Sequence, residues 1–451
     1  NSDGKGSSVW DVFTKIPGKT YKGSNGDIAV DHYHLYKEDV ALMAELGLKA
    51  YRFSVSWPRI YPSGRGEINE AGLQFYDRLI DELLTQKIEP VLTLYHWDVP
   101  QALMEAYGAW ESREIIKDFN EYCITLYKRF GDRVKYWVSL NEQNFNSKHS
   151  FITAMHPPAV KDRKRFYQAN HIAFLANAKV IESFRQYVTA GKIGPSFAYS
   201  PAYPATSRPE DVLAFENAED FTNNWWLDTY CWAKYPIAAF EYLKQEGLAP
   251  KVEEGDFELL EQGTPDFIGV NYYHTLTYEF NPLDGVSEGA FNVTGQKGST
   301  ESTGVPGLYK TTRNSHLETS NWDWAIDPTG LRVGLRRLTS RYRLPVFITE
   351  NGLGEFDTLA PGNVINDEYR IAYLNSHLAQ CRQAINDGVD LIGYCSWSFT
   401  DLLSWLNGYQ KRYGFVYVNR DETDARDLRR IRKKSFSWYK DVIRTNGSSV
   451  S

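Results

Sequence analysis

The chain has few cysteines, no long apolar run and no excess of basic residues, and each shortage excludes a class of protein. Only four of its 451 residues are cysteines, and their wide spacing without a CxxC motif argues against a disulfide framework or a cysteine-ligated zinc site. No uninterrupted apolar stretch approaches the roughly 20 residues that a membrane span needs, so a membrane protein is not expected. The cysteines are predicted to be buried free thiols of a cytoplasmic protein: Cys123, Cys231, Cys381 and Cys395.

The net charge and the spacing of the histidines exclude further classes of binding partner. Lys and Arg number 50 and Asp and Glu number 57, which gives a formal net charge of −7, so nucleic acid is not an expected partner. The nine histidines show no ligand spacing such as HExxH, and we expect neither a metal nor another cofactor. Aromatic residues make up 15% of the chain, which suits a large core and equally suits the binding of sugar rings. A small-molecule partner is therefore favoured.

Short apolar runs alternate with segments of helical spacing along the whole chain. Near-continuous apolar character, as in VLTLY and VFITE, is typical of parallel strands that are covered on both faces. The predicted strands span residues 49–57, 89–97, 134–142, 192–200, 265–273, 344–352 and 391–399. Helical spacing occurs between them, for example over 39–46 and 76–84. The alternation predicts an α/β fold, either a (β/α) barrel or a doubly wound sheet, and the lack of a linker predicts one domain over residues 1–451.

The number of predicted strands is one short of a closed barrel, and one polar segment interrupts the alternation of strands and helices. A closed barrel needs eight strands and seven are counted, so a barrel would have its first strand before Asn1 or in a segment without a clear pattern. Residues 284–307 are rich in Gly, Ser and Thr, and we expect them to form an exposed loop after the fifth predicted strand.

The predicted strands end in polar or aromatic residues, which would converge on one rim of a parallel barrel. Two of these residues are carboxylates, Glu142 in VSLNE and Glu350 in VFITE. A single glutamate at a strand end is commonly a surface charge or half of an ion pair. A pair of carboxylates on one rim, however, is the machinery of glycosidic bond cleavage, in which one protonates the leaving oxygen and the other attacks or activates water.

Six ordered motifs give this chain a resemblance to glycoside hydrolase family 1, the retaining β-glucosidase type. They are YRFSVSWPRI, LYHWDVP, NEQN, DFIGVNYY, FITENG and WSFTDLLSW, and the similarity runs from about Asp3 to KKSFSWY near the C-terminus. The resemblance implies an eight-stranded (β/α)8 TIM barrel. In this family the first strand ends in a Gln-x-Glu-Gly segment whose Gln binds the sugar, and this sequence begins just after that segment, so we expect that the first strand is missing or truncated.

The resemblance also implies roles for individual residues. Glu142 resembles the general acid/base, and Glu350 resembles the nucleophile, whose ionised form Arg52 and Tyr273 would favour. The remaining polar and aromatic residues at the strand ends resemble sugar ligands: His96, Asn141, Asn271 and Trp397.

The segment SWLNGYQKRY indicates a phosphorylated sugar. Family members that act on unmodified glucosides carry Glu-Trp where this chain has Ser404 and Trp405. Ser404, Lys411 and Tyr413 resemble the phosphate-binding pattern of the 6-phospho-β-glycosidase branch, and their hydroxyl, ammonium and phenol groups suit a dianion. Trp405 resembles the galactosidase-like arrangement, so we expect 6-phospho-β-glucosides and 6-phospho-β-galactosides to be accepted.

Two other functions stay open at this point. One is a β-glucosidase or β-galactosidase for unmodified sugars, which the serine at position 404 disfavours. The other is a catalytically inactive sugar-binding barrel, which the presence of both glutamates disfavours. The favoured function is a cytoplasmic enzyme that cleaves phosphorylated disaccharides, such as cellobiose-6-phosphate or lactose-6-phosphate, or aryl β-glycoside phosphates.

Overall fold

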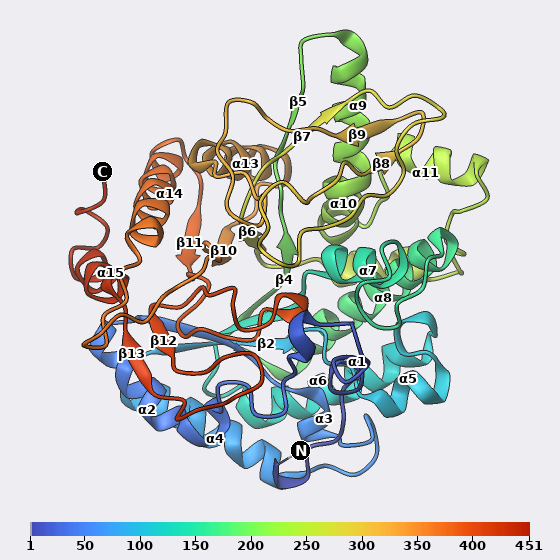
Figure 1. Cartoon of the computed structure of the whole chain (residues 1–451). Helices are drawn as coiled ribbons and strands as arrows, with labels where there is room; N and C mark the ends of the chain where they lie inside the picture. The colour runs from blue at the N-terminus through green and yellow to red at the C-terminus, as the bar shows by residue number, and fades with distance from the viewer. Residues whose placement is uncertain (1) are drawn as a thin grey trace. The chain divides into compact units, whose positions relative to one another are not determined.

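A computed structural model describes residues 2–451 of the chain (Figure 1). The contacts between residues divide it into two compact units, which are described in turn. No helix among these residues is long and apolar enough to cross a bilayer. Of the described residues, the first unit comprises 2–16, 49–198 and 224–269, and the second comprises 17–48, 199–223 and 270–451.

Four parallel strands form the centre of the first unit. They are β1 (Ala50–Ser54), β2 (Glu89–Tyr95), β3 (Tyr136–Asn141) and β4 (Lys192–Ala198), and each pairs with the next along the chain. Most of their residues are buried, as expected of parallel strands with both faces covered. Because parallel strands share one direction, their carboxyl ends lie at the same edge of the sheet.

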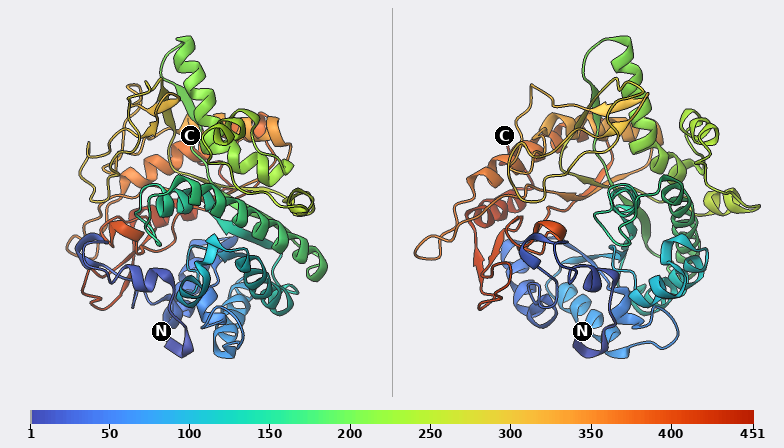
Figure 2. Two further views of the ribbon diagram at one scale, coloured as in Figure 1. Left: turned by 90° about the vertical axis from the view of Figure 1, so that its right-hand side faces the viewer. Right: turned by 45° about the vertical axis from the view of Figure 1, so that its right-hand side comes forward.

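Amphipathic helices cover these strands. In α4 the residues Leu73, Tyr76, Ile80 and Leu83 recur at helical spacing and are all buried. Helices α6 and α8 lie side by side (Figure 2), and the carboxylate of Asp162 caps α8 by accepting the backbone N–H of Arg165. The helices of the first unit are α1 (Val9–Phe13), α3 (Trp57–Ile60), α4 (Glu70–Thr85), α5 (Gln101–Tyr107), α6 (Glu114–Phe130), α7 (Gln143–Phe151), α8 (Arg163–Tyr187), α10 (Trp225–Trp232), α11 (Ile237–Gln245) and α12 (Asp256–Gln262).

Strand β6 (Ile268–Tyr272) begins in the first unit and ends in the second. Hydrogen bonding orders the strands as β1-β2-β3-β4-β6-β10-β11, which is the order along the chain. In the second unit β10 (Val346–Asn351) and β11 (Leu391–Tyr394) are parallel neighbours. The helices of this unit are α2 (His32–Leu46), α9 (Pro209–Glu219), α13 (Pro328–Tyr342), α14 (Glu368–Asn386) and α15 (Lys434–Arg444).

Helices α2, α14 and α15 share one apolar core with the segment that follows β11. Leu46, Leu374, Phe415 and Phe436 are members of this core and are almost fully buried. Each such side chain stabilises the fold by about 1.5–3 kcal/mol relative to an exposed position. The core therefore fixes the base of the segment that contains residues 401–413.

Two small sheets complete the second unit. One has the order β5-β7-β9-β8, and the other is the antiparallel pair β12-β13. Their bounds are β5 (Ala202–Pro204), β7 (Leu276–Glu279), β8 (Gly304–Val305), β9 (Tyr309–Thr311), β12 (Val416–Val418) and β13 (Arg430–Arg432). Short 3₁₀ turns lie at Ser2–Gly4, Tyr21–Gly23, Ala109–Glu111 and Trp405–Asn407, and a π-helical turn lies at Asp220–Asn224.

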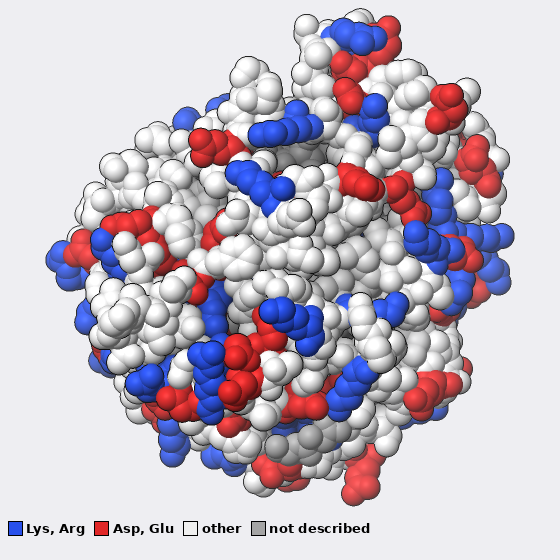
Figure 3. All heavy atoms as spheres, viewed as in Figure 1, with Lys and Arg blue, Asp and Glu red and all other residues white. Residues whose placement is uncertain are grey.

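A strand is present within each of the seven predicted ranges, and the predicted helical segments lie in α2 and α4. Two predicted ends are wrong: β1 ends at Ser54 because helix α3 begins at Trp57, and β11 ends at Tyr394, after which residues 395–399 are irregular. Residues 284–303 form an irregular loop that leads into β8, and Asn292 is its only buried residue, so the expected exposed loop is confirmed for this part of the range. The cysteines are free thiols, but only Cys123 and Cys381 are fully buried, whereas Cys231 and Cys395 are half-buried. Basic and acidic side chains are interspersed over the face shown in Figure 3, as expected for a chain with similar numbers of basic and acidic residues.

Candidate active site

Three polar side chains near the carboxyl ends of β1, β2 and β3 are joined by hydrogen bonds in the first unit. Arg52 donates from Nη2 to Oδ1 of Asn141 at 2.6 Å, and from Nε to the hydroxyl of Thr93 at 3.0 Å. Asn141 Nδ2 lies 3.0 Å from Nε2 of His96. The indole N–H of Trp97 donates to the backbone carbonyl of Asn141 at 2.7 Å. These bonds hold the Asn141 amide, which is only 1% exposed, in one orientation.

The same bonds determine where the proton of His96 lies. Because a guanidinium can only donate, Arg52 identifies Oδ1 as the acceptor end of the Asn141 amide. Nδ2 of Asn141 therefore donates to Nε2 of His96, and the imidazole carries its proton on Nδ1. Burial, and to a lesser extent the positive charge of Arg52, hold the pKa of His96 well below its usual value. His96 is thus a neutral hydrogen-bonding group at physiological pH.

Glu142 follows β3 directly and has an unusual backbone conformation. Its φ of 48° and ψ of 52° lie in the left-handed region, which costs a non-glycine residue about 1–2 kcal/mol. Its backbone N–H donates to the carbonyl of Ser196 at 2.7 Å, and its carbonyl accepts the N–H of Asn146 at the start of α7. The side chain is buried, with 7% exposed. Strand and helix therefore fix a strained glutamate next to Asn141.

Glu350 lies near the end of β10 in the second unit and is held by a short hydrogen bond. The hydroxyl of Tyr273 donates to its Oε2 at 2.6 Å, and the carboxylate is 4% exposed. A hydrogen bond of this kind stabilises the ionised form of a carboxylate. The neighbours of Glu350 in the sequence are also hydrogen-bonded. The Thr349 hydroxyl donates to Oδ1 of Asn271 at 2.7 Å, and Nδ2 of Asn351 donates to the backbone carbonyl of Tyr272 at 2.8 Å. The residues before and after Glu350 are therefore both anchored.

Lys411 lies in an aromatic cage in the second unit. Its ammonium is 3.7 Å from the ring centroid of Trp324, 4.9 Å from that of Trp322 and 5.6 Å from that of Tyr413. The side chain is 1% exposed, and burial lowers its pKa to about 7, against a weaker opposing effect of Glu355. No ion pair of Lys411 is found in the part of the chain that the structure describes. The cage thus holds a cation whose charge is balanced mainly by ring faces.

The cage requires a glycine at position 354. A Cβ atom there would lie 2.5 Å from the Tyr413 ring and 2.7 Å from Cε of Lys411. Both distances are shorter than any ordinary carbon contact, so a side chain would displace Lys411 and Tyr413 together. Tyr413 also contacts Tyr273 edge-on, with ring centroids 6.2 Å apart, which links the cage to the partner of Glu350.

Ser404 begins a tight turn that contains Trp405. The backbone N–H of Ser404 donates to the Gly408 carbonyl at 2.9 Å, and Asn407 donates from Nδ2 to the Ser404 carbonyl at 3.1 Å. Trp322 of the cage donates from its indole nitrogen to Oδ1 of Asn407 at 3.0 Å. Ser404 is buried with 5% exposed, and Trp405 is half-buried with a left-handed φ of 46°. The turn and the cage of Lys411 are therefore parts of one hydrogen-bonded structure.

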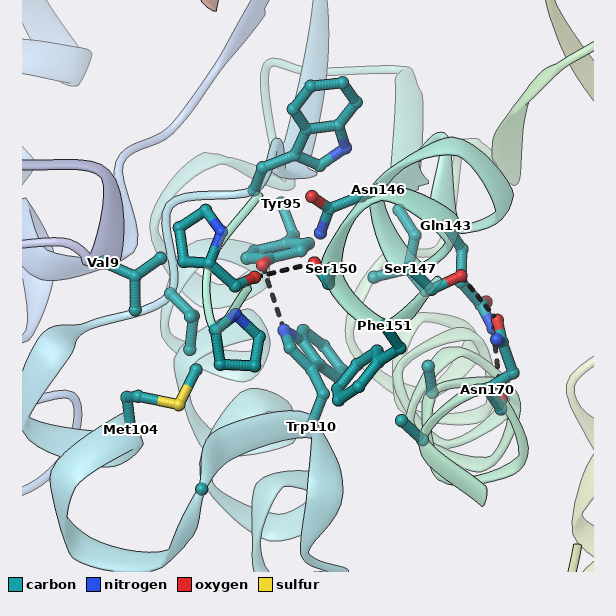
Figure 4. Close-up of a pocket in the computed structure, with 18 of the residues that line it drawn as sticks. Val9, Tyr95, Met104, Trp110, Gln143, Asn146, Ser147, Ser150, Phe151 and Asn170 are labelled. Carbon is teal, nitrogen blue, oxygen red and sulfur yellow. Dashed lines mark hydrogen bonds between the residues drawn. The ribbon is translucent and has the colours of Figure 1, made fainter. Parts of the chain in front are cut away.

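A pocket in the first unit lies beside the strand that carries Asn141 (Figure 4). Its volume is about 50 Å³, and seven of its 20 lining residues are aromatic residues or prolines. Asn141 and Gln143, on either side of Glu142, contribute to its lining. The hydroxyl of Tyr95 accepts the indole N–H of Trp110 at 3.0 Å, and Ser150 donates to the Pro157 carbonyl at 2.7 Å.

The structure groups the residues predicted from sequence into two sets. Arg52, His96, Asn141 and Glu142 lie together in the first unit. The set in the second unit consists of Asn271, Tyr273, Glu350, Trp397, Ser404, Trp405, Lys411 and Tyr413. Trp397 donates its backbone N–H to the carbonyl of Asn351, next to Glu350, at 2.8 Å. No group of three or more His, Cys, Asp or Glu side chains suited to a metal ion occurs among residues 2–451.

Sequence reasoning missed the two tryptophans of the cage. Trp322 and Trp324 lie in the segment NWDWA, where two bulky aromatics surround an acidic residue just before α13. Such a pair in an irregular segment is a weak signal of a binding surface. Nothing in the local pattern links it to Lys411, which is 87 residues away from Trp324 along the chain (411 − 324).

Comparison with known proteins places this chain among carbohydrate hydrolases. The family model described as "Glycosyl hydrolase family 1" matches residues 1–448. Aryl-phospho-beta-D-glucosidase BglC of Bacillus subtilis is 76% identical over 450 residues, covering all of this chain and 94% of the relative. Phospho-cellobiase of Klebsiella oxytoca is 40% identical and covers 98% and 90% of the two chains. The family 1 β-glucosidase structure from Thermotoga maritima superposes with a TM-score of 0.89 at 36% identity, covering 99% and 93%.

Proposed function

Because the chain belongs to glycosyl hydrolase family 1, we propose that it hydrolyses 6-phospho-β-D-glucosides with retention of configuration. It has the (β/α) barrel fold of this family. The observation that carries the choice of substrate is the buried, aromatic-caged ammonium of Lys411 in a loop that has Ser404 at its start. The names of the similar proteins, an aryl-phospho-β-glucosidase and a phospho-cellobiase, support phosphorylated aryl glucosides and disaccharides as substrates.

Each carboxylate has a separate role in the proposed reaction. Glu350 attacks the anomeric carbon and forms a glycosyl-enzyme ester, while Glu142 gives its proton to the departing glycosidic oxygen. Glu142, now ionised, then takes a proton from water as that water attacks the anomeric carbon and releases Glu350. The Tyr273 hydroxyl keeps Glu350 ionised before the attack, because its hydrogen bond favours the charged form.

The neutral groups of the first unit are proposed to bind the sugar hydroxyls. Hydrogen bonds to Arg52 and His96 already fix the orientation of the Asn141 amide, so it can bind the sugar 2-hydroxyl without losing further side-chain freedom. His96, being neutral, can bind a hydroxyl without adding charge beside the reacting centre. Asn271, Trp397 and Trp405 are proposed to complete the sugar site.

The second unit is proposed to bind the 6-phosphate. Lys411 supplies the charge, and the hydroxyls of Ser404 and Tyr413 supply directional hydrogen bonds. We propose that the site around Trp405 accepts either orientation of the sugar 4-hydroxyl, so 6-phospho-β-galactosides are second substrates. We further propose that the enzyme is cytoplasmic, where sugars phosphorylated on uptake occur, and that residues 1–451 work as one catalytic domain.

The function is tested with four nitrophenyl β-glycosides, glucose and galactose each with and without a 6-phosphate. We expect kcat/KM to favour the phosphorylated pair by roughly 10²–10⁴-fold, the value of a desolvated charge contact of several kcal/mol. Equal or faster cleavage of the unmodified sugars would make the protein a β-glycosidase of neutral substrates.

Glu142→Gln should slow cleavage according to the basicity of the leaving group, because glutamine has a similar shape but no proton to give. For an alkyl 6-phospho-β-glucoside we expect a loss of kcat/KM of about 10³-fold, and for the dinitrophenyl analogue a loss of about 10-fold or less. A parallel series with wild-type enzyme supplies the baseline. Equal losses on both leaving groups would remove Glu142 from the acid/base role.

The charge state of Lys411 should give the phosphate preference a pH dependence. Its pKa of about 7 means that the ammonium is present below pH 7 and is lost as the pH rises. We therefore expect the ratio of kcat/KM for the phosphorylated substrate to that for its neutral analogue to fall about tenfold per pH unit above 7. Other titrating groups, such as the two glutamates, affect both substrates equally, so their effect cancels in this ratio of kcat/KM values.

The matched variant for this experiment is Lys411→Arg. A guanidinium stays charged throughout this range, so the ratio for this variant should stay constant above pH 7. A flat ratio in the wild-type enzyme would exclude Lys411 as the titrating phosphate ligand.

A further inference from the structure

Arg412 follows Lys411 in the chain, but its side chain makes contacts only with the protein interior. It is 6% exposed, and its Nη1 donates to Oδ2 of Asp401 at 2.7 Å. Its two terminal nitrogens also donate to the backbone carbonyls of Val418 at 3.0 Å and Arg420 at 2.8 Å. The guanidinium carbon lies 4.0 Å from the ring centroid of Tyr417. These contacts leave Arg412 unable to serve as a second cation for the phosphate.

The backbone at Arg412 is fixed as firmly as its side chain. Its N–H donates to the carbonyl of Glu355 at 2.9 Å, and its carbonyl accepts the N–H of Glu355 at 3.0 Å, which forms an antiparallel bridge. In an extended segment, consecutive side chains point to opposite sides. Because Arg412 points inward toward Asp401, Lys411 and Tyr413 must point to the other side.

Asp401, at the start of the loop formed by residues 401–412, binds groups at the end of that loop. Besides Arg412 it accepts the ammonium of Lys433 at 2.6 Å and the backbone N–H of Gly414 at 3.1 Å, and it is 2% exposed. Arg370 adds a bond from Nη2 to the carbonyl of Arg412 at 2.8 Å. The segment between residues 401 and 412, which contains Ser404, therefore begins and ends at one buried ion pair.

Glu422 supports the middle of the same segment. Its carboxylate accepts the backbone N–H groups of Tyr409 at 2.8 Å and Gln410 at 2.7 Å. At Gly408, where φ is +72°, an added Cβ would lie 2.1 Å from that carboxylate. The loop is thus pinned at both ends and in the middle by groups that do not reach the proposed substrate.

From this arrangement we propose that Arg412 and Asp401 form a clamp that positions Lys411 and Ser404 for the phosphate group. The inference rests on the proposed function and goes beyond it by assigning the selectivity to two residues that touch no part of the substrate. Arg412 is a positioning residue: it sets the direction of Lys411 through the alternation of the chain, and Asp401 sets the span of the loop.

The test replaces Arg412 by Met, which keeps much of the length and apolar volume but removes the ion pair and the carbonyl bonds. Asp401 would still be paired with Lys433, so no buried carboxylate is left alone. We expect KM for nitrophenyl 6-phospho-β-glucoside to rise roughly 10- to 100-fold, the usual effect of a displacement near 1 Å, with little change in kcat. The value of kcat/KM for the unmodified glucoside should stay within about twofold of wild type.

A double-mutant cycle separates the clamp from the proposed function. Lys411→Ala alone tests the phosphate site, and its failure to reduce selectivity would overturn the proposed function. If Lys411→Ala is selective, adding Arg412→Met to it should cause little further loss, because the clamp acts through Lys411. Additive losses, or an equal loss on both substrates, would overturn the clamp while leaving the phosphate site intact.

The pH profile provides a readout that a general loss of stability would not move. The groups that face the Lys411 ammonium are the rings of Trp322, Trp324 and Tyr413 and, electrostatically, Glu355. If Arg412→Met releases Lys411 from this cage, the fall of the selectivity ratio should move from about pH 7 to higher pH.

A milder variant keeps the proposal testable if Arg412→Met does not fold. Tyr417→Leu removes only the ring that stacks on Arg412, and we expect a smaller shift of KM in the same direction. A folded Tyr417→Leu enzyme with unchanged selectivity and an unmoved pH limit would count against the clamp.

Discussion

Glu350→Ala should remove nearly all glycosidase activity and leave the chain folded, with kcat/KM falling on the order of 10⁵-fold, as when other enzymes lose a covalent nucleophile. The carboxylate is buried at the end of β10 and bonds to the Tyr273 hydroxyl, so its removal deletes the proposed attacking atom and one hydrogen bond. The anchors of β10 through Thr349 and Asn351 remain. The fold should survive because the lost contacts lie at the strand end.

The control for this variant is Tyr273→Phe, which removes only the hydrogen bond to Glu350. A single bond to a charged group is worth about 1.5–3 kcal/mol, so kcat/KM should fall by roughly 10- to 100-fold. Thermal unfolding of both variants should stay within a few degrees of wild type. More than about 1% residual activity in purified Glu350→Ala enzyme would remove Glu350 from the role of nucleophile.

Ser404→Glu should invert the substrate preference. Ser404 is buried at the start of the turn next to the caged Lys411, so a carboxylate there would face the 6-phosphate dianion at close range and would also pair with the ammonium. Juxtaposed like charges cost several kcal/mol, which predicts a loss of about 10³-fold in kcat/KM for nitrophenyl 6-phospho-β-glucoside. The unmodified glucoside should be cleaved as fast as before or faster, since the new carboxylate can accept bonds from its free hydroxyls.

Ser404→Ala is the matched variant, because it removes the hydroxyl without adding charge. We expect it to lose about tenfold on the phosphorylated substrate and nothing on the unmodified one. The decisive number is the ratio of the two kcat/KM values for each enzyme. If Ser404→Glu lowers both values equally, residue 404 does not face the phosphate, and the turn at 404–408 has only a structural role.

The strands of the main sheet were predictable because each one is marked by its own short stretch of apolar residues. Strands such as β2 and β10 are near-continuous apolar runs, and a short run of this kind bounded by polar residues is typical of a strand buried in a parallel sheet. Strands β5, β8 and β9 span only two or three residues, so they show no periodicity and were missed. Their positions depend on pairing partners elsewhere in the second unit.

The residues of the proposed site stand out in sequence motifs, but their surroundings could not be predicted. Glu350, Lys411 and Ser404 are visible in short sequence patterns. The cage around Lys411 brings together segments that are far apart in the chain, and sequence periodicity carries no information on such contacts. The inward direction of Arg412 likewise depends on the bridge to Glu355, which only the folded chain reveals.

The left-handed backbone of Glu142 sets stability and activity against each other at one position. Glycine adopts this conformation without a steric penalty, so by folding energy alone it is the better residue there. A screen of random variants for heat resistance would therefore tend to enrich Glu142→Gly, which lacks the proposed proton donor. Selection for thermal tolerance in this enzyme should therefore be coupled to turnover, or it will favour the loss of this glutamate.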